Sequence, residues 1–164
     1  MRDVKASPPS ADGRVAWHRM LQVSRRVLRE LDALLDERHR IGVNEFDVLI
    51  TLDNAERRRL RMTDLAEAVM LSSGGLTRLV GRLESRELVE RVPDPDDGRA
   101  FYAALTRAGS RRLAQARVTH DAVIHDLLGS MLDEAELGAL AETLGRVLAP
   151  SASTERPGAG EATG

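Results

Sequence analysis

Hydrogen-bonding side chains between Ser72 and Arg82 occupy the positions that apolar residues leave free. The apolar residues of this stretch recur at i, i+3, i+4 and i+7, the spacing of one buried helix face; they are Leu76, Leu79, Val80 and Leu83. The residues left outside are small or able to form hydrogen bonds: Ser72, Ser73, Gly74, Thr77, Arg78, Gly81 and Arg82. No acidic residue interrupts the stretch between Glu67 and Glu84.

This outer face has the chemistry to bind the major groove of DNA. Backbone N–H groups at a helix N-terminus and the hydroxyls of Ser72 and Thr77 can bind phosphate. An arginine can donate a pair of hydrogen bonds to guanine O6 and N7, and Arg78 and Arg82 are the candidates for that contact. The plainer alternative is a solvated face with an ordinary capping serine, although such a face usually carries acidic residues as well.

A second candidate contact lies in an acidic turn between two alternating apolar stretches, 88–92 and 101–105. The change of period from 3.6 to 2, together with the Pro/Asp/Gly turn, predicts a β-hairpin. Because an acidic loop should avoid DNA, we expect Asp97 to brace Arg99 by a salt bridge and to aim its guanidinium into a minor groove. The alternative is a plain Asp-Gly turn.

Short helices must position these groups. We expect Thr63 to cap a helix over 64–69, and a second helix to start near Ser72 or Ser73 and to run to about Arg86. Two short helices, a tight turn and a hairpin form the plan of a winged helix-turn-helix. The predicted fold is therefore mainly α with a small β-hairpin wing, and with N- and C-terminal dimerisation helices. The predicted DNA-contacting set is Thr63, Ser72, Ser73, Gly74, Thr77, Arg78 and Arg82, with Arg99 of the wing braced by Asp97.

The flanking helices are predicted from periodicity and capping signals. A long helix with a wide apolar stripe spans Arg14 to about Arg38, and we expect Gly42 to end it. Asn44, with Asp47 three residues on, resembles the cap of a short helix through Leu52.

Two further helices follow the hairpin. Thr106 is expected to cap one that runs to about Leu128, and Asp133 with Glu136 forms a capping box for a Leu-rich last helix. The first and last helices offer more apolar surface than a winged helix of about 65 residues can cover, so we expect a homodimer. Its two-fold axis would place the recognition helices roughly 34 Å apart, one turn of DNA.

The domain organisation follows from these elements. The predicted boundaries are disordered tails at 1–13 and 150–164, a single domain at 14–149, a DNA-binding lobe at 43–106, and dimerisation helices within 14–42 and 107–149.

Charge and composition limit the function classes. The net charge of −2 from 24 basic and 26 acidic residues hides a segregated field, because 13 arginines and 8 acidic residues between Arg57 and Arg117 leave that stretch at +5. The absence of cysteine excludes disulfides, thiolate nucleophiles and thiol redox sensing. His120 and His125 are too far out of phase to bind metal as an i, i+4 pair.

Other classes are disfavoured by what the sequence lacks. No triad, paired-carboxylate motif or phosphate loop lies on a plausible strand-to-helix junction, so we expect neither an enzyme nor a cofactor. No apolar stretch approaches a membrane span or a signal peptide, so we expect a cytoplasmic protein without membrane contact.

The stretch from Leu60 to Gly109 resembles the MarR (multiple antibiotic resistance regulator) family of bacterial transcription factors. The likeness rests on several short motifs: Thr77-Arg78-Leu79-Val80, Arg82-Leu83-Glu84, Leu88-Val89-Glu90-Arg91, the D-x-R of the wing, and the L-T-x-x-G that ends at Gly109. With its flanking helices the resemblance covers about 14 to 148. Two departures are Ser73-Gly74-Gly75, where the family often has a long polar or basic side chain, and Gly98 in the middle of the wing motif.

The resemblance implies a homodimeric regulator, with each lobe reading half of a pseudo-palindromic operator on double-stranded DNA. It also implies release by a small, often phenolic or carboxylate, ligand in a crevice between the dimerisation helices and the DNA-binding lobe. We therefore predict a repressor released by a small-molecule effector. The alternative is a dimeric helical adaptor whose winged lobe binds protein.

Candidates for the effector crevice are aromatic, acidic or basic residues on the flanking helices: Trp17, His18, Asp47, Arg107, Arg111 and His120. Each has a plainer role. Trp17 fits a dimer core, Asp47 fits a helix cap, and the arginines fit solvent or phosphate.

Overall fold

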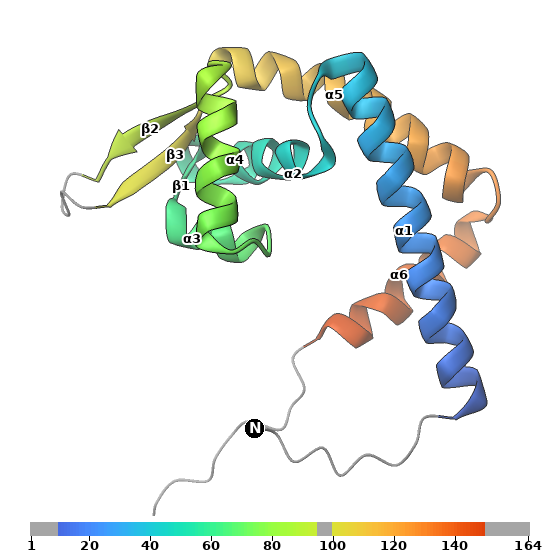
Figure 1. Ribbon diagram of the computed structural model, residues 1–164. Helices are drawn as coiled ribbons and strands as arrows, with labels where there is room; N and C mark the ends of the chain where they lie inside the picture. The colour runs from blue at the N-terminus through green and yellow to red at the C-terminus, as the bar shows by residue number, and fades with distance from the viewer. Residues whose placement is uncertain (1–9, 95–99, 150–164) are drawn as a thin grey trace, which may run out of the picture. The chain divides into compact units, whose positions relative to one another are not determined.

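The computed structural model describes residues 10–94 and 100–149 of the 164-residue chain. The chain divides into two compact units, one up to His125 and one from Asp126 onward. The fold is mainly helical with a small antiparallel sheet, as the sequence predicts (Figure 1). Within the described ranges, no helix is long and apolar enough to cross a membrane.

The elements of the first unit are α1 (Ala11–His39), α2 (Val43–Asn54), the 3₁₀ turn η1 (Glu56–Arg58), β1 (Arg59–Arg61), α3 (Met62–Ala68), α4 (Ser73–Ser85), β2 (Val89–Pro93), β3 (Phe101–Leu105) and α5 (Arg107–Ile124). The π-helical turn η2 (His125–Gly129) begins at the boundary between the units. Helix α6 (Glu134–Leu148) belongs to the second unit.

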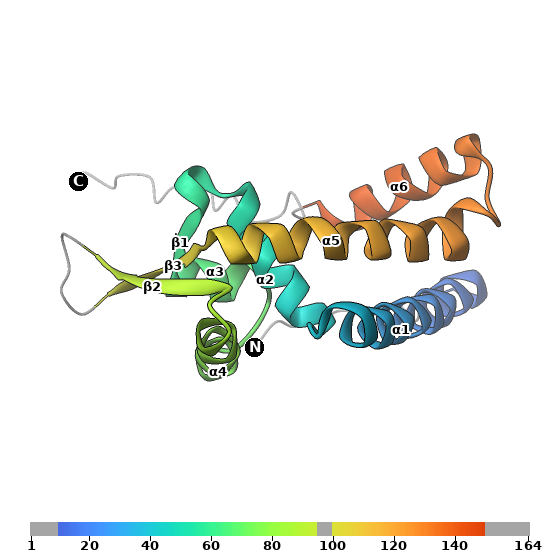
Figure 2. The same cartoon turned by 90° about the horizontal axis from the view of Figure 1, so that it is seen from above.

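A compact apolar core joins α2, α3, α4 and the sheet. Its members are at most 2% exposed: Phe46, Leu49, Leu52, Leu65, Leu76, Val80, Leu83, Val89 and Ala103. The buried face predicted for α4 is confirmed, since Leu76, Leu79, Val80 and Leu83 are all buried. This burial orients the opposite face of α4 toward solvent, and Figure 2 shows the helix lying against one side of the hairpin.

The sheet contains a strand that the sequence analysis did not anticipate. Strand order is β1-β3-β2, and all pairs are antiparallel. The hairpin of β2 and β3 is confirmed, and Arg59–Arg61, to which the sequence assigned no helix or strand, pairs with β3 as a third strand. With two arginines in three residues, β1 lacks the apolar alternation by which strands are recognised.

Helix α1 begins earlier than expected and ends close to the expected Arg38. It begins at Ala11, inside the predicted tail, because Ser10 Oγ accepts a hydrogen bond of 3.0 Å from Gly13 N. Its last residue is His39, and the residue that terminates it is Arg40, in the left-handed conformation with φ of 57°, and not Gly42. Its apolar stripe is covered only near the C-terminal end, where Leu31 and Leu35 are buried.

The capping expected at Asn44 and Asp47 is wrong, because α2 begins earlier, with Gly42 as its N-cap. The Glu45 carboxylate accepts from Gly42 N at 3.3 Å, and Asp32 Oδ1 on α1 accepts from Val43 N at 2.9 Å. Orphan N–H groups of the first turn are thus satisfied by carboxylates, one of them from another helix.

Helix α5 begins where predicted. Thr106 Oγ1 accepts from Gly109 N at 2.9 Å and donates to the carbonyl of Glu87 at 2.7 Å, so the cap also ties α5 to the end of α4. Gly109 is required by packing, because a Cβ there would lie 2.1 Å from the carbonyl oxygen of Leu88. We expected α5 to run to about Leu128, but its α-helical part stops at Ile124, and the π-helical turn η2 covers the rest of the predicted range.

The C-terminal end of α1 packs on α5 (Figure 2). His39 Nε2 lies 2.7 Å from Thr119 Oγ1, and Arg112 donates to the carbonyl of His39. Burial, with the nearby charges of Arg112 and Arg38, lowers the pKa of His39. The contact therefore favours a neutral imidazole at this position.

The second unit confirms the predicted capping box. Asp133 Oδ1 accepts from Glu136 N at 2.9 Å, and Glu136 Oε2 accepts from Asp133 N at 2.9 Å. The apolar stripe of α6 stays open to solvent, with Val147 69% and Leu148 83% exposed.

Candidate nucleic-acid interface

Helices α3 and α4 are joined by the tight turn of a helix-turn-helix. Leu71 N donates to the carbonyl of Ala66 at 2.9 Å, and Met70 has φ of 51°, in the left-handed region. Helix α4 starts at Ser73, within the predicted start, and Ser72 caps it by accepting from Gly75 N at 3.2 Å. The first turn of α4 contains no acidic residue, so its N-terminal N–H groups face no competing carboxylate from their own helix.

The N-terminal half of α4 presents an open surface. Its exposed residues include Ser72, Ser73, Gly74, Thr77 and Arg78. A Cβ at Gly74 would meet no atom within 4 Å, so packing does not require glycine there. Thr77 Oγ1 donates to the carbonyl of Ser73 at 2.8 Å, and no ion pair or hydrogen bond engages Arg78 within the described part of the chain.

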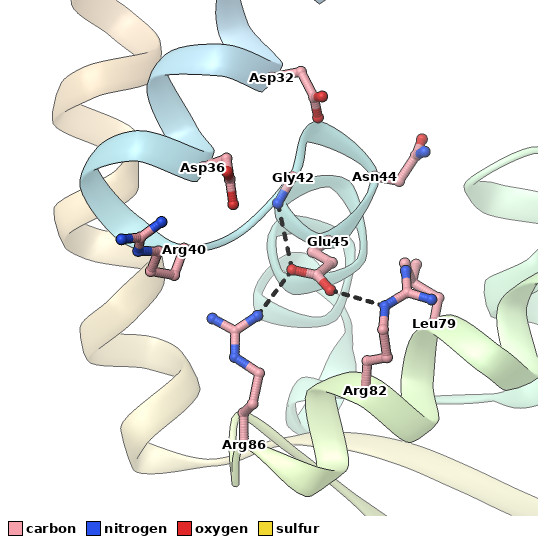
Figure 3. Close-up of a pocket in the computed structure, with 9 residues that line it drawn as sticks. All are labelled: Asp32, Asp36, Arg40, Gly42, Asn44, Glu45, Leu79, Arg82 and Arg86. Carbon is pink, nitrogen blue, oxygen red and sulfur yellow. Dashed lines mark hydrogen bonds and ion pairs between the residues drawn. The ribbon is translucent and has the colours of Figure 1, made fainter.

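The C-terminal half of α4 is fastened to α2. Arg82 Nε lies 3.4 Å from Glu45 Oε1, and Arg86 Nη1 lies 3.0 Å from Glu45 Oε2 (Figure 3). Glu45 is 7% exposed, so its carboxylate is buried between the two guanidiniums. Arg82 is therefore exposed but already paired, whereas Arg78, one turn earlier, is free to meet a ligand.

A third arginine connects α4 with the wing. Arg91 Nε of β2 lies 3.5 Å from Glu84 Oε2, and Arg91 Nη2 donates to the carbonyl of Thr77 at 3.4 Å. The same group would lie 3.9 Å from a Cβ at Gly81, which is half-buried. The hairpin and α4 thus hold a fixed relation to each other.

The root of the wing is fixed by an ion pair. Asp94, only 3% exposed, lies 2.5 Å from Arg61 Nη2 of β1, and Asp94 N donates to the carbonyl of Ala100 at 3.0 Å. The Tyr102 hydroxyl, 3.2 Å from Arg61 Nε, and the Asp94 carboxylate both raise the pKa of Arg61. Asp97 and Arg99, predicted to brace and to enter a minor groove, lie outside the described residues.

Thr63 does not cap α3 as expected. The helix begins two residues earlier with Arg61 as its N-cap, and Thr63 is an exposed residue of the first turn whose hydroxyl donates to Asp64 Oδ1 at 3.1 Å. Its exposure at the start of α3 still leaves the hydroxyl on the surface of the helix pair.

The six residues predicted for an effector crevice are only partly brought together. His120 stacks on Phe46 with ring centroids 4.7 Å apart, beside Asp47. Burial raises the pKa of Asp47, and the positive charge of His120 acts in the opposite direction. On α1, Trp17 is 55% exposed and His18 is exposed; on α5, Arg107 and Arg111 are exposed.

Two shallow clefts lie in the first unit, and none of these six residues lines either of them. One, of about 360 Å³, is shown in Figure 3 and is lined by Asp32, Asp36, Arg40, Gly42, Asn44, Glu45, Leu79, Arg82 and Arg86. The other, of about 380 Å³, is lined by Glu56, Arg57, Arg59, Leu60 and Tyr102.

Sequence reasoning missed the residues that hold the interface in place. Glu45, Arg86 and Arg91 anchor α4, and Arg61 anchors the wing. Apart from Glu84 and Arg91, which are seven positions apart, the partners are distant in sequence. The usable signals are weak: Glu45 follows Gly42 at the spacing of a capping box. Within the described residues, no cluster of three or more acidic or histidine side chains could hold a metal ion.

Comparison with known proteins gives a consistent family assignment. Residues 41–100 match the MarR family. The HTH-type transcriptional regulator MhqR of Bacillus subtilis is 33% identical over 111 residues, spanning 66% of this chain and 74% of MhqR. The multiple antibiotic resistance protein MarR of Escherichia coli is 29% identical over 131 residues, or 80% of this chain and 87% of that protein.

Solved structures extend the likeness beyond the lobe. The MarR family transcriptional regulator Sco3205 of Streptomyces coelicolor, crystallised in complex with DNA, superposes with a TM-score of 0.81 at 25% identity, covering 88% of this chain and 91% of that one. The regulator AbsC from the same organism gives a TM-score of 0.77 at 27% identity, covering 87% and 95%.

Proposed function

The chain belongs to the MarR family, and on this premise we propose that it is a homodimeric, sequence-specific DNA-binding regulator of transcription. It acts by occupying double-stranded DNA and not by catalysing a reaction, and the proposal involves no cofactor. A protein that binds chromosomal DNA shares the compartment of the chromosome, so we place it in the cytoplasm.

The open N-terminal half of α4 carries this proposal. Arg78 is unpaired among the described residues, a Cβ at Gly74 would meet no atom within 4 Å, and the first turn holds no acidic residue. In the major groove, Ser72 and Ser73 would bind phosphate, and Thr77 and Arg78 would contact base edges. A face that only met solvent would have no need to keep the Arg78 guanidinium unpaired and the first turn of the helix without an acidic residue.

Two further contacts complete the assignment. Thr63, exposed at the start of α3, would bind phosphate beside the major groove, and Arg99 of the loop between β2 and β3, braced by Asp97, would enter the adjacent minor groove. Arg82 is assigned a smaller part, because Glu45 competes with DNA for its guanidinium.

Exposed apolar faces support the dimer. On α1, Trp17 is 55% and Leu28 50% exposed, and on α6, Val147 is 69% exposed. Soluble monomers seldom expose contiguous apolar patches of this kind. A second copy would cover them and would set two copies of α4 against successive turns of a pseudo-palindromic operator.

We propose further that the protein is a repressor released by a small-molecule effector. The relative MprA of Escherichia coli is named a transcriptional repressor. Asp47 and His120, which lie close to each other and next to an aromatic ring, are the best-supported effector contacts among the six predicted residues. Trp17, His18, Arg107 and Arg111 would join them only if effector binding or dimerisation assembled the crevice.

The test is selection of duplexes from a random pool by the purified full chain, followed by binding measurements at several salt concentrations. We expect an enriched inverted repeat with half-sites about one helical turn apart and an affinity that falls steeply with salt. Failure to enrich any sequence, with no retardation at low salt, would contradict the proposal and favour the protein-binding adaptor.

A further inference from the structure

The wing sheet has a buried face and an open face. Val89 and Ala103 on the buried face are at most 1% exposed. On the other face the register places Arg61, Tyr102 and Val92 side by side, and all three are only half-buried. We call the group Arg57, Arg59, Arg61 and Tyr102 the outer basic face.

An aromatic ring organises the cations of the outer basic face. The guanidinium of Arg59 lies 4.8 Å from the centroid of the Tyr102 ring, and that of Arg61 lies 5.7 Å away. Arg61 Nε also donates to the Tyr102 hydroxyl at 3.2 Å. Stacking over a ring leaves the edge of a guanidinium free to donate hydrogen bonds, so Arg59 is oriented without being neutralised.

Arg57 extends the outer basic face beyond the sheet. Its side chain is 71% exposed and lines the cleft of about 380 Å³ together with Arg59 and Tyr102. Three carboxylates share the region: Glu56 lies 3.8 Å from Arg57 Nε, Asp94 is paired with Arg61, and Glu90 is on β2, at the opposite edge of the sheet. The three arginines lie at or beside the β1 edge, and among the described residues Arg59 is the one of them that no carboxylate pairs.

This basic edge adjoins the root of the wing. Arg61 is paired with Asp94, the last described residue before the loop that carries Arg99. If that loop enters a minor groove, as the proposed function requires, the outer basic face lies beside the backbone that borders the groove. Phosphates there belong to DNA next to the half-site that α4 reads.

We propose that the outer basic face binds the phosphate backbone of duplex DNA flanking the operator. The inference rests on the proposed function, and it adds a contact that carries affinity without sequence information. Arginine suits this task because its planar donors match phosphate oxygens. Each phosphate contact releases counterions, so the flank adds to the salt dependence of binding.

The experiment uses the full chain and two duplexes. One contains only the inverted repeat recovered by selection, and the other extends it by about one helical turn, roughly 10 bp, on each side. We expect the wild type to bind the longer duplex several-fold more tightly, with a steeper salt slope. The double variant Arg57→Ala with Arg59→Ala should bind both duplexes alike, with the slope on the long one lowered by about one for each phosphate that is no longer neutralised.

Arg58→Ala is the matched control. It removes the same charge from the same segment, but Arg58 faces elsewhere, 3.4 Å from Asp53 and 3.1 Å from Ser110 on α5. It should keep the gain from the flanks, and thermal unfolding will show whether each variant is folded.

The outcomes separate the two proposals. If the wild type binds the short operator but gains nothing from the flanks, or if the double variant keeps the gain, the flank contact is wrong and the proposed function stands. Binding to neither duplex by the wild type would overturn both.

Discussion

The arginines at the two ends of α4 differ in whether they have a carboxylate partner. Arg78, in the N-terminal half, is exposed and unpaired among the described residues, and one turn before it a Cβ at Gly74 would meet no atom within 4 Å. Arg82, in the C-terminal half, and Arg86, the C-cap residue, share the buried carboxylate of Glu45. One end of the helix is thus kept free for a ligand, while the other end is used to hold the helix in place.

The largest effect on stability is expected for Gly109→Ala, which tests the close contact between α5 and Leu88, just after the end of α4. A Cβ would come within 2.1 Å of the Leu88 carbonyl, a contact that backbone movement alone can relieve. We expect a loss of about 3 kcal/mol in the free energy of unfolding, measured by urea denaturation. The matched control is Gly138→Ala on α6, where a Cβ meets nothing within 4 Å. Equal stability of the two variants would refute the close approach of α5 to the end of α4.

Arg78→Ala tests the free end. Removing a base contact should cost about 1–3 kcal/mol of operator binding, and should relax sequence preference at one position of each half-site. The free energy of unfolding should stay unchanged, because no described group depends on this side chain. Arg82→Ala is the variant for comparison. We expect it to lower the free energy of unfolding and to change sequence preference little. Binding isotherms against single-base operator variants decide between them, and the reverse pattern would exchange the roles of the two arginines.

Glu45→Ala measures how much the ion pairs of Glu45 with Arg82 and Arg86 contribute to stability. It leaves two arginines without their shared carboxylate and removes a hydrogen bond to Gly42 N, so we expect a loss of about 1–2 kcal/mol in unfolding free energy. The estimate is modest because the Arg82 side chain is 60% exposed and can be solvated. Glu45→Gln should recover part of the loss. If the losses of unfolding free energy in Glu45→Ala and Arg82→Ala are strictly additive in the double variant, this would argue against coupling between Glu45 and Arg82.

Gly74→Ala should separate stability from binding in a single change. Alanine favours a helix over glycine by roughly 0.8–1 kcal/mol in the interior, and somewhat less is expected near the N-terminus. Since the site is open, the variant should unfold at a slightly higher temperature. The same methyl group should obstruct close approach of DNA and weaken operator binding. A variant that gains stability and binds as well as the wild type would remove Gly74 from the interface.

The sequence predicted those features whose signals are local. The spacing of Leu76, Leu79, Val80 and Leu83 identified the buried face of α4, and Thr106 and Asp133 were recognised as caps from their own side chains. Each of these depends on contacts within a few residues. Local chemistry is also what allowed the exposed face of α4 to be read as a possible DNA surface.

Features made by distant residues escaped prediction. Glu45 meets Arg82 and Arg86 across 37 and 41 positions, and no periodicity connects them. The caps expected at Asn44 and Thr63 failed because several residues compete to begin a helix, and the choice is made by neighbours such as Asp32 of α1. Strand β1 exists because β3 offers it a partner, although its own side chains carry no strand pattern.

The open half of α4 bears on how such a protein can diversify. Since Ser73, Gly74, Thr77 and Arg78 contribute little to the core, they can be exchanged for other residues while Glu45 and its arginines keep the helix seated. New operator preferences can then arise without a loss of folding that would eliminate them first. A library randomised at these four positions should therefore be rich in folded proteins, and it offers a direct route to variants that recognise chosen DNA sequences.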